Sequence, residues 1–247
     1  MILQSLQLSL LSAVDNRTLQ IKIKQRLNKL ASNDYDNIQC WQIVEAFNKG
    51  QSDWCRRNLH GVNQKQEGDE QSTSRVDDLQ KLLISTPIVL IDRITFYETP
   101  ALPPDYMRWK RVSIKATAEC CSDPKPMVVY LTEQGNLDEL LRDKNKQPNF
   151  EWGETFAMMK DNKMQIYTNG LFQVVNPEFT YYRQPVKIQI NGCTDPYTLL
   201  QSTVDVECEF KDDLTEVLID EAAKIIAGDI ESMTQMQRNS QSVEGNN

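Results

Sequence analysis

The chain has 247 residues, of which 40% are apolar and 25% charged, a balance typical of one large or two small folded domains. Its net charge is −8 and its pI about 4.9, so the surface as a whole repels phosphate backbones, and the basic residues form no dedicated nucleic-acid-binding face. An acidic surface does suit a channel through which DNA slides without specific binding. No apolar run is long enough to span a bilayer, so we expect no membrane partner.

The amino-terminal segment, residues 1–14, is rich in leucine but interrupted by glutamine and serine. It lacks the basic leader of a signal peptide, and its pattern is interpreted as an amphipathic helix that needs a partner surface. A further helix is predicted over residues 17–31, where Leu19, Ile23 and Leu27 keep a helical spacing.

The next helix follows a polar break, with an N-cap at Asp36 or Asn37, and stops at His60-Gly61. After a polar loop, a short helix over residues 74–84 ends before Pro87. Helices joined in this way bury their apolar faces together, so we expect a helical bundle that occupies residues 1–86.

The middle of the chain, residues 87–210, is predicted to be a β domain. Short runs of β-branched and aromatic residues alternate with turn signals such as Asn169-Gly170, a pattern that favours an antiparallel sandwich or barrel. A short helix over residues 137–142 interrupts the strands. The predicted strands cover residues 87–98, 112–118, 128–131, 164–167, 172–175, 179–182 and 186–190.

The last predicted element is a long helix over residues 211–238. Asp213 and Glu216 have the spacing of a capping box, and an apolar stripe follows them. We expect this helix to pack back on the amino-terminal bundle, and residues 239–247 to be a polar tail. The predicted fold class is therefore α+β: a helical bundle, a central β domain and a returning helix.

The six cysteines are Cys40, Cys55, Cys120, Cys121, Cys193 and Cys208. Their spacings match no compact disulfide framework, and without a signal peptide the expected state is reduced, buried thiols.

Residues that could carry chemistry are few. No phosphate-binding loop, zinc spacing, nucleophile elbow or dinucleotide fingerprint is present. His60, the single histidine, is interpreted as a helix-terminal residue, because no catalytic partner is suggested. Glu151 and Glu154 could serve a glycosidase, but solvated carboxylates on an aromatic loop are the more common case. The sequence thus predicts a non-enzymatic protein that needs neither a cofactor nor a metal.

Several stretches resemble neck and tail ring proteins of tailed bacteriophages, especially those of the crAss-like podoviruses. The likeness covers most of the chain and includes a form of the Leu-Pro-x-Asp-Tyr turn common in phage neck proteins. The ordered series of a helical head, that turn, a tyrosine-rich β middle and a final helix with an acidic start is more specific than the turn alone. The stretches that carry it are residues 41–49 (WQIVEAFNK), 54–57 (WCRR), 67–72 (EGDEQS), 76–80 (VDDLQ), 102–109 (LPPDYMRW), 181–185 (YYRQP) and the closing helix 216–229.

The resemblance implies a structural virion protein that forms a closed ring, usually twelvefold, and stacks below the portal. Such a head–tail connector or portal adaptor extends the DNA channel and seats the tail. Its partners would be further copies of itself, the portal protein, other tail rings and passing double-stranded DNA. It would be located in the neck or tail of the virion and assembled in the cytoplasm of the bacterial host.

A ring subunit needs two different side surfaces, since a head-to-tail contact closes when its rotation closes. The apolar amino-terminal segment, large aromatic residues and the last helix are the candidates for these surfaces. The interface candidates are Leu3, Leu6, Leu10, Trp41, Trp54, Tyr106, Trp109, Tyr181, Tyr182, Met233 and Met236.

Two alternatives remain open at this point. A capsid-associated or cargo protein of the same virion would share this composition without forming a ring. A tail-associated glycan hydrolase would use Glu151 and Glu154.

Overall fold

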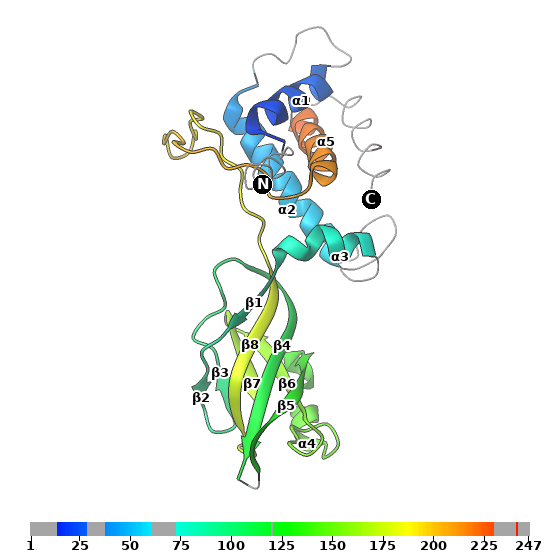
Figure 1. The fold of residues 1–247 in the computed structure, drawn as a ribbon, viewed down its shortest axis with the longest axis vertical. Helices are drawn as coiled ribbons and strands as arrows, with labels where there is room; N and C mark the ends of the chain where they lie inside the picture. The colour runs from blue at the N-terminus through cyan, green and yellow to red at the C-terminus, as the bar shows by residue number, and fades with distance from the viewer. Residues whose placement is uncertain (1–13, 29–37, 61–72, 120, 230–240, 242–247) are drawn as a thin grey trace, which may run out of the picture. The chain divides into compact units, whose positions relative to one another are not determined.

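The computed structural model describes residues 14–28, 38–60, 73–119, 121–229 and 241. The chain divides into two compact units: Met1–Lys81 together with Pro185–Asn247, and Leu82–Gln184. The first unit is mostly helical and the second contains the sheet (Figure 1). The predicted mixture of helical and β regions is therefore confirmed, and in sequence the second unit is an insertion into the first.

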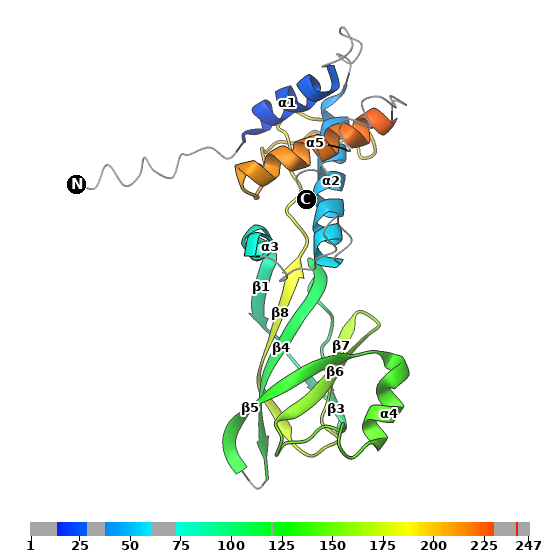
Figure 2. The ribbon, with the colours of Figure 1, turned by 90° about the vertical axis from the view of Figure 1, so that its right-hand side faces the viewer.

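The helical unit is built around its last helix, which packs against α1 and α2 (Figure 2). Apolar residues at helical spacing form its buried face, as they do on α1, where Leu19, Ile23 and Leu27 are fully buried. The described helices of this unit are α1 (Asn16–Asn28), α2 (Cys40–His60), α3 (Thr73–Leu79) and α5 (Asp212–Asp229).

Contacts of two kinds hold α5 in place. Gly50 of α2 allows a close approach, because a Cβ added there would lie 3.3 Å from Cγ of Glu221. On α1, Arg26 places Nε 2.7 Å from Oδ1 of Asp220 and Nη2 3.2 Å from Oε2 of Glu216. These interactions fix the rotation of α5, so its apolar face points at both partner helices.

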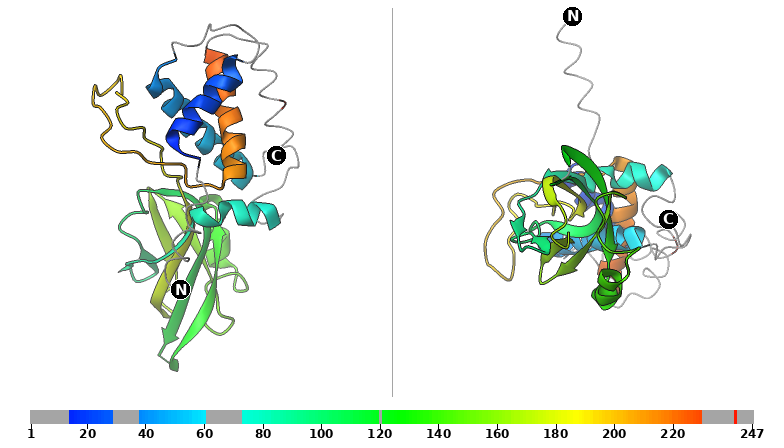
Figure 3. Two further views of the ribbon diagram at one scale, coloured as in Figure 1. Left: turned by 45° about the horizontal axis from the view of Figure 1, so that its top comes forward. Right: turned by 90° about the horizontal axis from the view of Figure 1, so that it is seen from below.

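The β unit is one eight-stranded sheet in the order β1-β8-β4-β5-β6-β7-β3-β2. Figure 3 shows how the sheet curls around itself. The 3-10 turn η3 (Gln134–Asn136) and helix α4 (Leu137–Arg142) lie between β5 and β6 in the chain. The strands are β1 (Leu83–Pro87), β2 (Ile91–Asp92), β3 (Phe96–Glu98), β4 (Tyr106–Ala118), β5 (Cys121–Thr132), β6 (Glu154–Lys160), β7 (Lys163–Tyr167) and β8 (Gln173–Arg183).

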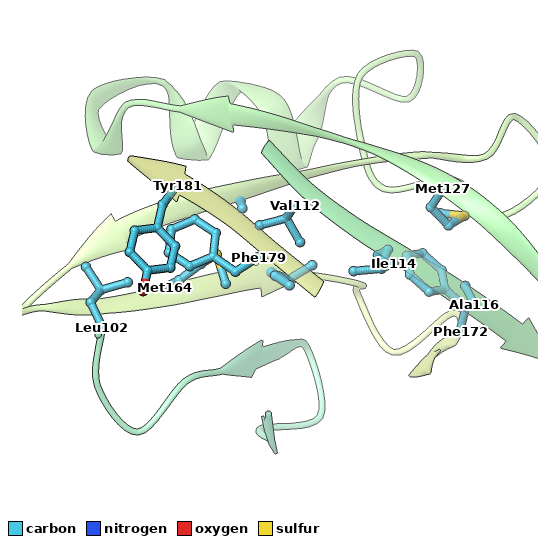
Figure 4. Close-up of a cluster of buried hydrophobic side chains, with 11 residues drawn as sticks. Leu102, Val112, Ile114, Ala116, Met127, Met164, Phe172, Phe179 and Tyr181 are labelled. Atoms are coloured by element: carbon cyan, nitrogen blue, oxygen red, sulfur yellow. The ribbon is translucent and has the colours of Figure 1, made fainter. Parts of the chain in front are cut away.

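The inner face of the curled sheet carries the main core of this unit (Figure 4). Alternate residues of β4, Val112, Ile114 and Ala116, point into it, as period-two strand geometry requires. Phe179 lies at its centre, with ring centroids 5.0 Å from Tyr181 and 5.4 Å from Trp109. A smaller apolar cluster on β6 and β7 packs against leucines of α4.

Four predictions about this region need correction. The sheet is not wholly antiparallel, because β5 and β6 pair in parallel, with Tyr130 opposite Phe156. It is also a single sheet, so the sandwich alternative is wrong, whereas the curl makes the sheet a half-barrel and so agrees in part with the barrel alternative. Residues 185–210 belong with the helical unit, whereas the sequence placed them in a β domain over 87–210. Residues 186–190 form no strand, and only Gln189 makes an isolated bridge, to Val206.

Candidate functional site

The connection between β8 and α5, residues 184–211, is long and has no helix or strand of its own. Long loops without secondary structure are uncommon in compact domains and usually serve a function. Its central part, residues 189–206, runs out from the helical unit and returns (Figure 1, yellow to orange), and is called the arm below. Backbone hydrogen bonds join the outgoing and returning halves of the arm and stiffen it. Gly192 N–H donates to Ser202 O at 2.9 Å, and Ser202 N–H donates to Cys193 O at 2.8 Å.

Side chains of α2 hold the segment that leads into the arm. The carboxamide of Asn48 donates to Ile188 O at 3.2 Å and accepts from Ile188 N–H at 2.8 Å. Gln51, which is fully buried, donates to Val186 O at 2.9 Å. These side chains satisfy backbone groups that a neighbouring strand would satisfy in a sheet. The segment is thus extended without belonging to a sheet. Its apolar residues alternate like those of a strand, and Ile188 and Ile190 are buried like the inward-facing residues of a strand.

Asp205 fastens the base of the arm to α1. Its carboxylate accepts a hydrogen bond from Asn191 N–H at 3.0 Å and another from Nδ2 of Asn16 at 3.0 Å. These two bonds, the backbone one first, lower the pKa of Asp205, because both donors favour the charged carboxylate. Asn16 also donates to Gln189 O at 2.8 Å, so one side chain joins both limbs of the arm.

A disulfide ties the arm to the start of α2. Cys40 and Cys193 are bonded, with their Cα atoms 5.8 Å apart. The prediction of reduced thiols is wrong for this pair, because residues 153 positions apart meet only through the tertiary fold. Cys55 and Cys208 are buried thiols, and burial is the main reason that the pKa of Cys208 is raised.

A groove of about 750 Å³ lies between α2 and the arm. Its apolar walls include Trp41 and Val44 of α2, and Ile190, Tyr197 and Leu200 of the arm. The rings of Trp41 and Tyr197 meet edge to face across it, with centroids 6.5 Å apart. This volume is within the range of small-molecule and peptide pockets, which are mainly apolar with a few polar groups.

The tip of the arm exposes large apolar side chains to solvent. Tyr197 and Leu199 are each 79% exposed and Leu200 is 71% exposed. Leu199 has φ 56°, in the left-handed region that non-glycine residues rarely adopt. The turn is held by Asp195, whose backbone carbonyl accepts from Leu199 N–H at 2.9 Å. Exposed apolar residues that lie close together are typical of protein- or membrane-interaction surfaces and of ligand-binding grooves.

The predicted interface residues fall in different places. Of the candidates that the structure describes, Trp41 alone lines the groove. Trp54 is buried against Phe210, with ring centroids 6.0 Å apart, so it belongs to the core of the helical unit. Leu3, Leu6, Leu10, Met233 and Met236 lie outside the described residues.

The aromatic candidates of the β unit are mainly structural. Tyr181 and Tyr182 are buried, and Tyr106 and Trp109 are half-buried against the main core. The Tyr181 hydroxyl donates to Asp105 at 3.0 Å. Burial first, and then the bond to Asp105, raise the pKa of Tyr181. In this structure Tyr181 and Tyr182 thus pack inside the β unit.

The sequence interpretation missed Tyr197, Leu199 and Leu200. The signal that could have revealed them is an apolar run immediately after Asp195-Pro196, where a turn pair is normally followed by polar residues.

None of the three candidates for catalysis is among the residues that line the groove. His60 is the exposed last residue of α2, as predicted. Glu151 is exposed in a turn, and Glu154 is the exposed first residue of β6. Within the ranges that the structure describes, no three His, Cys, Asp or Glu side chains converge to hold a metal ion. Nor does any helix in those ranges have the length and apolarity of a membrane span.

Comparison with known proteins adds no family assignment: no protein-family model matches the chain, and no curated protein is significantly similar to it.

Proposed function

We propose that this chain is a structural component of a tailed-phage virion, a ring or adaptor protein of the neck or tail. In this role it stacks below the portal, extends the DNA channel and seats the tail. The observation that carries the proposal is the arm, a stiffened loop whose tip exposes Tyr197, Leu199 and Leu200. An apolar tip of this kind is suited to contact another protein subunit.

A ring subunit needs a projecting surface and a different receiving surface, because its contacts are head-to-tail. The arm tip supplies a surface of the first kind. The resemblance of the helical and aromatic motifs to phage ring proteins, described above, supplies the virion context. The closed, twelvefold ring and the portal as a partner are parts of the proposal that rest on this resemblance.

The test is the assembly state of the full chain. Purified protein is examined by multi-angle light scattering and negative-stain electron microscopy, alone and with portal protein. We expect closed rings, and we expect Leu199→Gln to weaken assembly by roughly thirtyfold, corresponding to about 2 kcal/mol at an interface hot spot. Val89→Gln is the matched control, since Val89 is also exposed, at 72%, but lies in the β unit.

A chain that stays monomeric, and does not bind portal or tail proteins at high concentration, would contradict the proposal. The position of the protein in virus particles distinguishes a ring protein from a capsid-associated or cargo protein. A ring protein must lie on the tail axis, whereas a capsid-associated or cargo protein need not.

A further inference from the structure

The base of the arm is anchored to the helical unit. Asn16 of α1 donates to Gln189 O at 2.8 Å and to Asp205 at 3.0 Å. Gln189 and Val206 also pair with each other through backbone hydrogen bonds of 3.1 and 2.8 Å. Because these contacts involve both limbs, they fix the base without help from the outer part of the arm.

The outer part, residues 192–202, is a hairpin whose limbs bond to each other. Gly192 N–H donates to Ser202 O at 2.9 Å, and Asp195 N–H donates to Leu200 O at 3.0 Å. These bonds lie within the arm, so they persist when its contacts with α2 are broken. A stiff hairpin on a fixed base can therefore pivot as one body.

A ring pair and a covalent bond restrain this hairpin against α2. The rings of Trp41 and Tyr197 meet edge to face, and Cys40 is bonded to Cys193. A single ring pair contributes little compared with a covalent bond. The disulfide is therefore the stronger of these two restraints, and breaking it releases the hairpin at this point.

The disulfide borders the groove. Cys193 is part of the groove lining although only 8% of the residue is exposed, and Cys40 is half-buried. The groove volume of about 750 Å³ is large enough to admit a small dithiol. The thiols of Cys55 and Cys208 differ from this pair, because both are buried.

The position of Cys40 suits it to leave as an anion. It is the first residue of α2, a helix of 21 residues that has no acidic side chain in its first turn. The N–H groups at the start of a helix carry partial positive charge and stabilise an anion there. A thiolate on Cys40 is therefore a good leaving group, which favours attack on the sulfur of Cys193.

We propose that the Cys40–Cys193 disulfide is a thiol-exchange site for small dithiols and that its reduction releases the arm from α2. One thiolate of the dithiol attacks Sγ of Cys193, the bond between the two cysteines breaks, and its electron pair leaves with Sγ of Cys40. The second thiol of the reductant then attacks the mixed disulfide and leaves as part of a cyclic disulfide. Two electrons pass to the protein, and the two protons of the dithiol end on Cys40 and Cys193.

The consequence is an arm with two states. Release of the hairpin takes Tyr197 and Leu200 away from Trp41, so the groove is complete in the oxidised protein and loses its outer wall in the reduced protein. The exposed tip is held in one orientation by the disulfide and turns freely without it. The inference goes beyond the ring proposal and does not depend on it, because neither the exchange nor the motion requires assembly.

The first test identifies the thiols that appear in the folded, full-length chain. The protein is equilibrated with reduced and oxidised dithiothreitol in defined ratios, alkylated without denaturant and analysed by mass spectrometry. We expect Cys40 and Cys193 to become alkylated together in one transition, while Cys55 and Cys208 stay unmodified. Reduction of the pair only in denaturant would overturn the proposal. Alkylation of the buried thiols in the same transition would also overturn it, because reduction would then unfold the helical unit.

A monothiol identifies the sulfur that is attacked. After brief treatment with glutathione and rapid alkylation, the mixed disulfide should be roughly tenfold more abundant on Cys193 than on Cys40. Equal amounts, or the reverse preference, would contradict the assignment of Cys40 as the leaving group.

Motion of the arm is measured with a photo-cross-linking phenylalanine analogue in place of Tyr197. In the oxidised protein it should cross-link to the peptide that contains Trp41. Reduction should lower that yield roughly tenfold, because the tip is no longer tethered beside α2. The matched control, Cys40→Ser with Cys193→Ser, should give the low yield with and without reductant. An unchanged yield on reduction would overturn the proposal.

Hydrogen exchange distinguishes release of the hairpin from unfolding of the connection. The amides of Ile188 and Val206 are hydrogen-bonded at the base of the arm, so they should stay protected in both redox states. Loss of their protection on reduction would contradict a pivot on a fixed base. Light scattering of the same samples reports on ring assembly separately, so failure of one proposal is distinguishable from failure of the other.

Discussion

Asn48 and Ile188 bond to each other in both directions, carboxamide N–H to backbone carbonyl at 3.2 Å and backbone N–H to carboxamide oxygen at 2.8 Å. A helix side chain thus acts as the strand partner of an extended segment. This pair, with Gln51, determines where the arm leaves the helical unit.

Replacing Asn48 with alanine removes both bonds to Ile188 and leaves part-buried backbone groups unsatisfied. We expect the free energy of unfolding to fall by about 1–3 kcal/mol, measured by urea denaturation. Asn48→Asp is the matched variant, because it keeps an acceptor for Ile188 N–H but, when ionised, sets a second acceptor against Ile188 O. Protonation restores a donor, so its stability relative to the alanine variant should rise on acidification, and no such rise would argue against the two-way bond.

Removing the Cys40–Cys193 disulfide, as in Cys40→Ser with Cys193→Ser, should lower the free energy of unfolding by roughly 2–4 kcal/mol. Reductant should produce the same loss in the unchanged protein and no further loss in the double variant. If reductant lowers the free energy of unfolding equally in the unchanged protein and the double variant, that loss does not come from the Cys40–Cys193 disulfide.

The bonds to Asp205 predict a pH dependence. Hydrogen bonds from Asn191 and Asn16 put the pKa of this carboxyl below its ordinary value of 3.8. A group with a lowered folded-state pKa contributes stability that is fully present above the unfolded-state value and is lost as the pH falls through the folded-state value.

Asp205→Asn should therefore be less stable than the unchanged protein at pH 7, and the difference should shrink below about pH 4. Denaturation midpoints from pH 7 to pH 3 measure it. A difference that grows on acidification would have the wrong sign for this mechanism.

Arg26 links α1 to Asp220 and Glu216 of α5, and the Asp220 side chain is only 10% exposed. A double-mutant cycle of Arg26→Met and Asp220→Asn should give a coupling energy of about 1–2 kcal/mol, because a charge-assisted bond at a partly buried site is only weakly screened.

The exposed pair Lys146–Glu139, at 2.9 Å, is the control for that cycle. Its coupling energy should be about 0.5 kcal/mol or less, since solvent screens it. Similar values for both pairs would show that the α1–α5 pair is as screened as a surface one.

Leu199 and Leu200 should respond differently to glycine. Leu199 has a left-handed backbone, which costs an L-residue about 1–2 kcal/mol, so Leu199→Gly should leave stability unchanged or raise it slightly. Leu200→Gly should lower stability by about 0.5–1 kcal/mol, because glycine adds flexibility to the unfolded chain. Thermal unfolding of both variants checks this contrast in sign.

Local patterns were sufficient for much of the fold. Helix α4 lies over Leu137–Arg142, where the sequence predicts it, and α2 ends at His60 as expected from the following glycine. Helix α5 begins at Asp212, so Asp213 lies inside the helix rather than at a cap. These elements depend on spacing and terminal residues within a few positions.

Contacts between distant residues were beyond the reach of local patterns. Val186, Ile188 and Ile190 alternate like a strand, but side chains of α2, some 135–140 positions away, bond to Val186 O and to both backbone groups of Ile188. Ile190 O accepts instead from Cys193 N–H. The parallel pairing of β5 and β6 and the meeting of Cys40 with Cys193 are likewise set by tertiary packing. The arm is a candidate site because its exposed tip lies next to the groove, a proximity that only the tertiary fold creates.

The disulfide closes the polypeptide around the whole of Leu82–Gln184, since Cys40 precedes that insertion and Cys193 follows it. A single protease cut at any bond between these two cysteines therefore leaves both fragments covalently joined. On a denaturing gel the cut protein would migrate as one band until reductant is added. The helical unit thus keeps its two sequence-distant halves together even when the chain that connects them through the sheet has been severed.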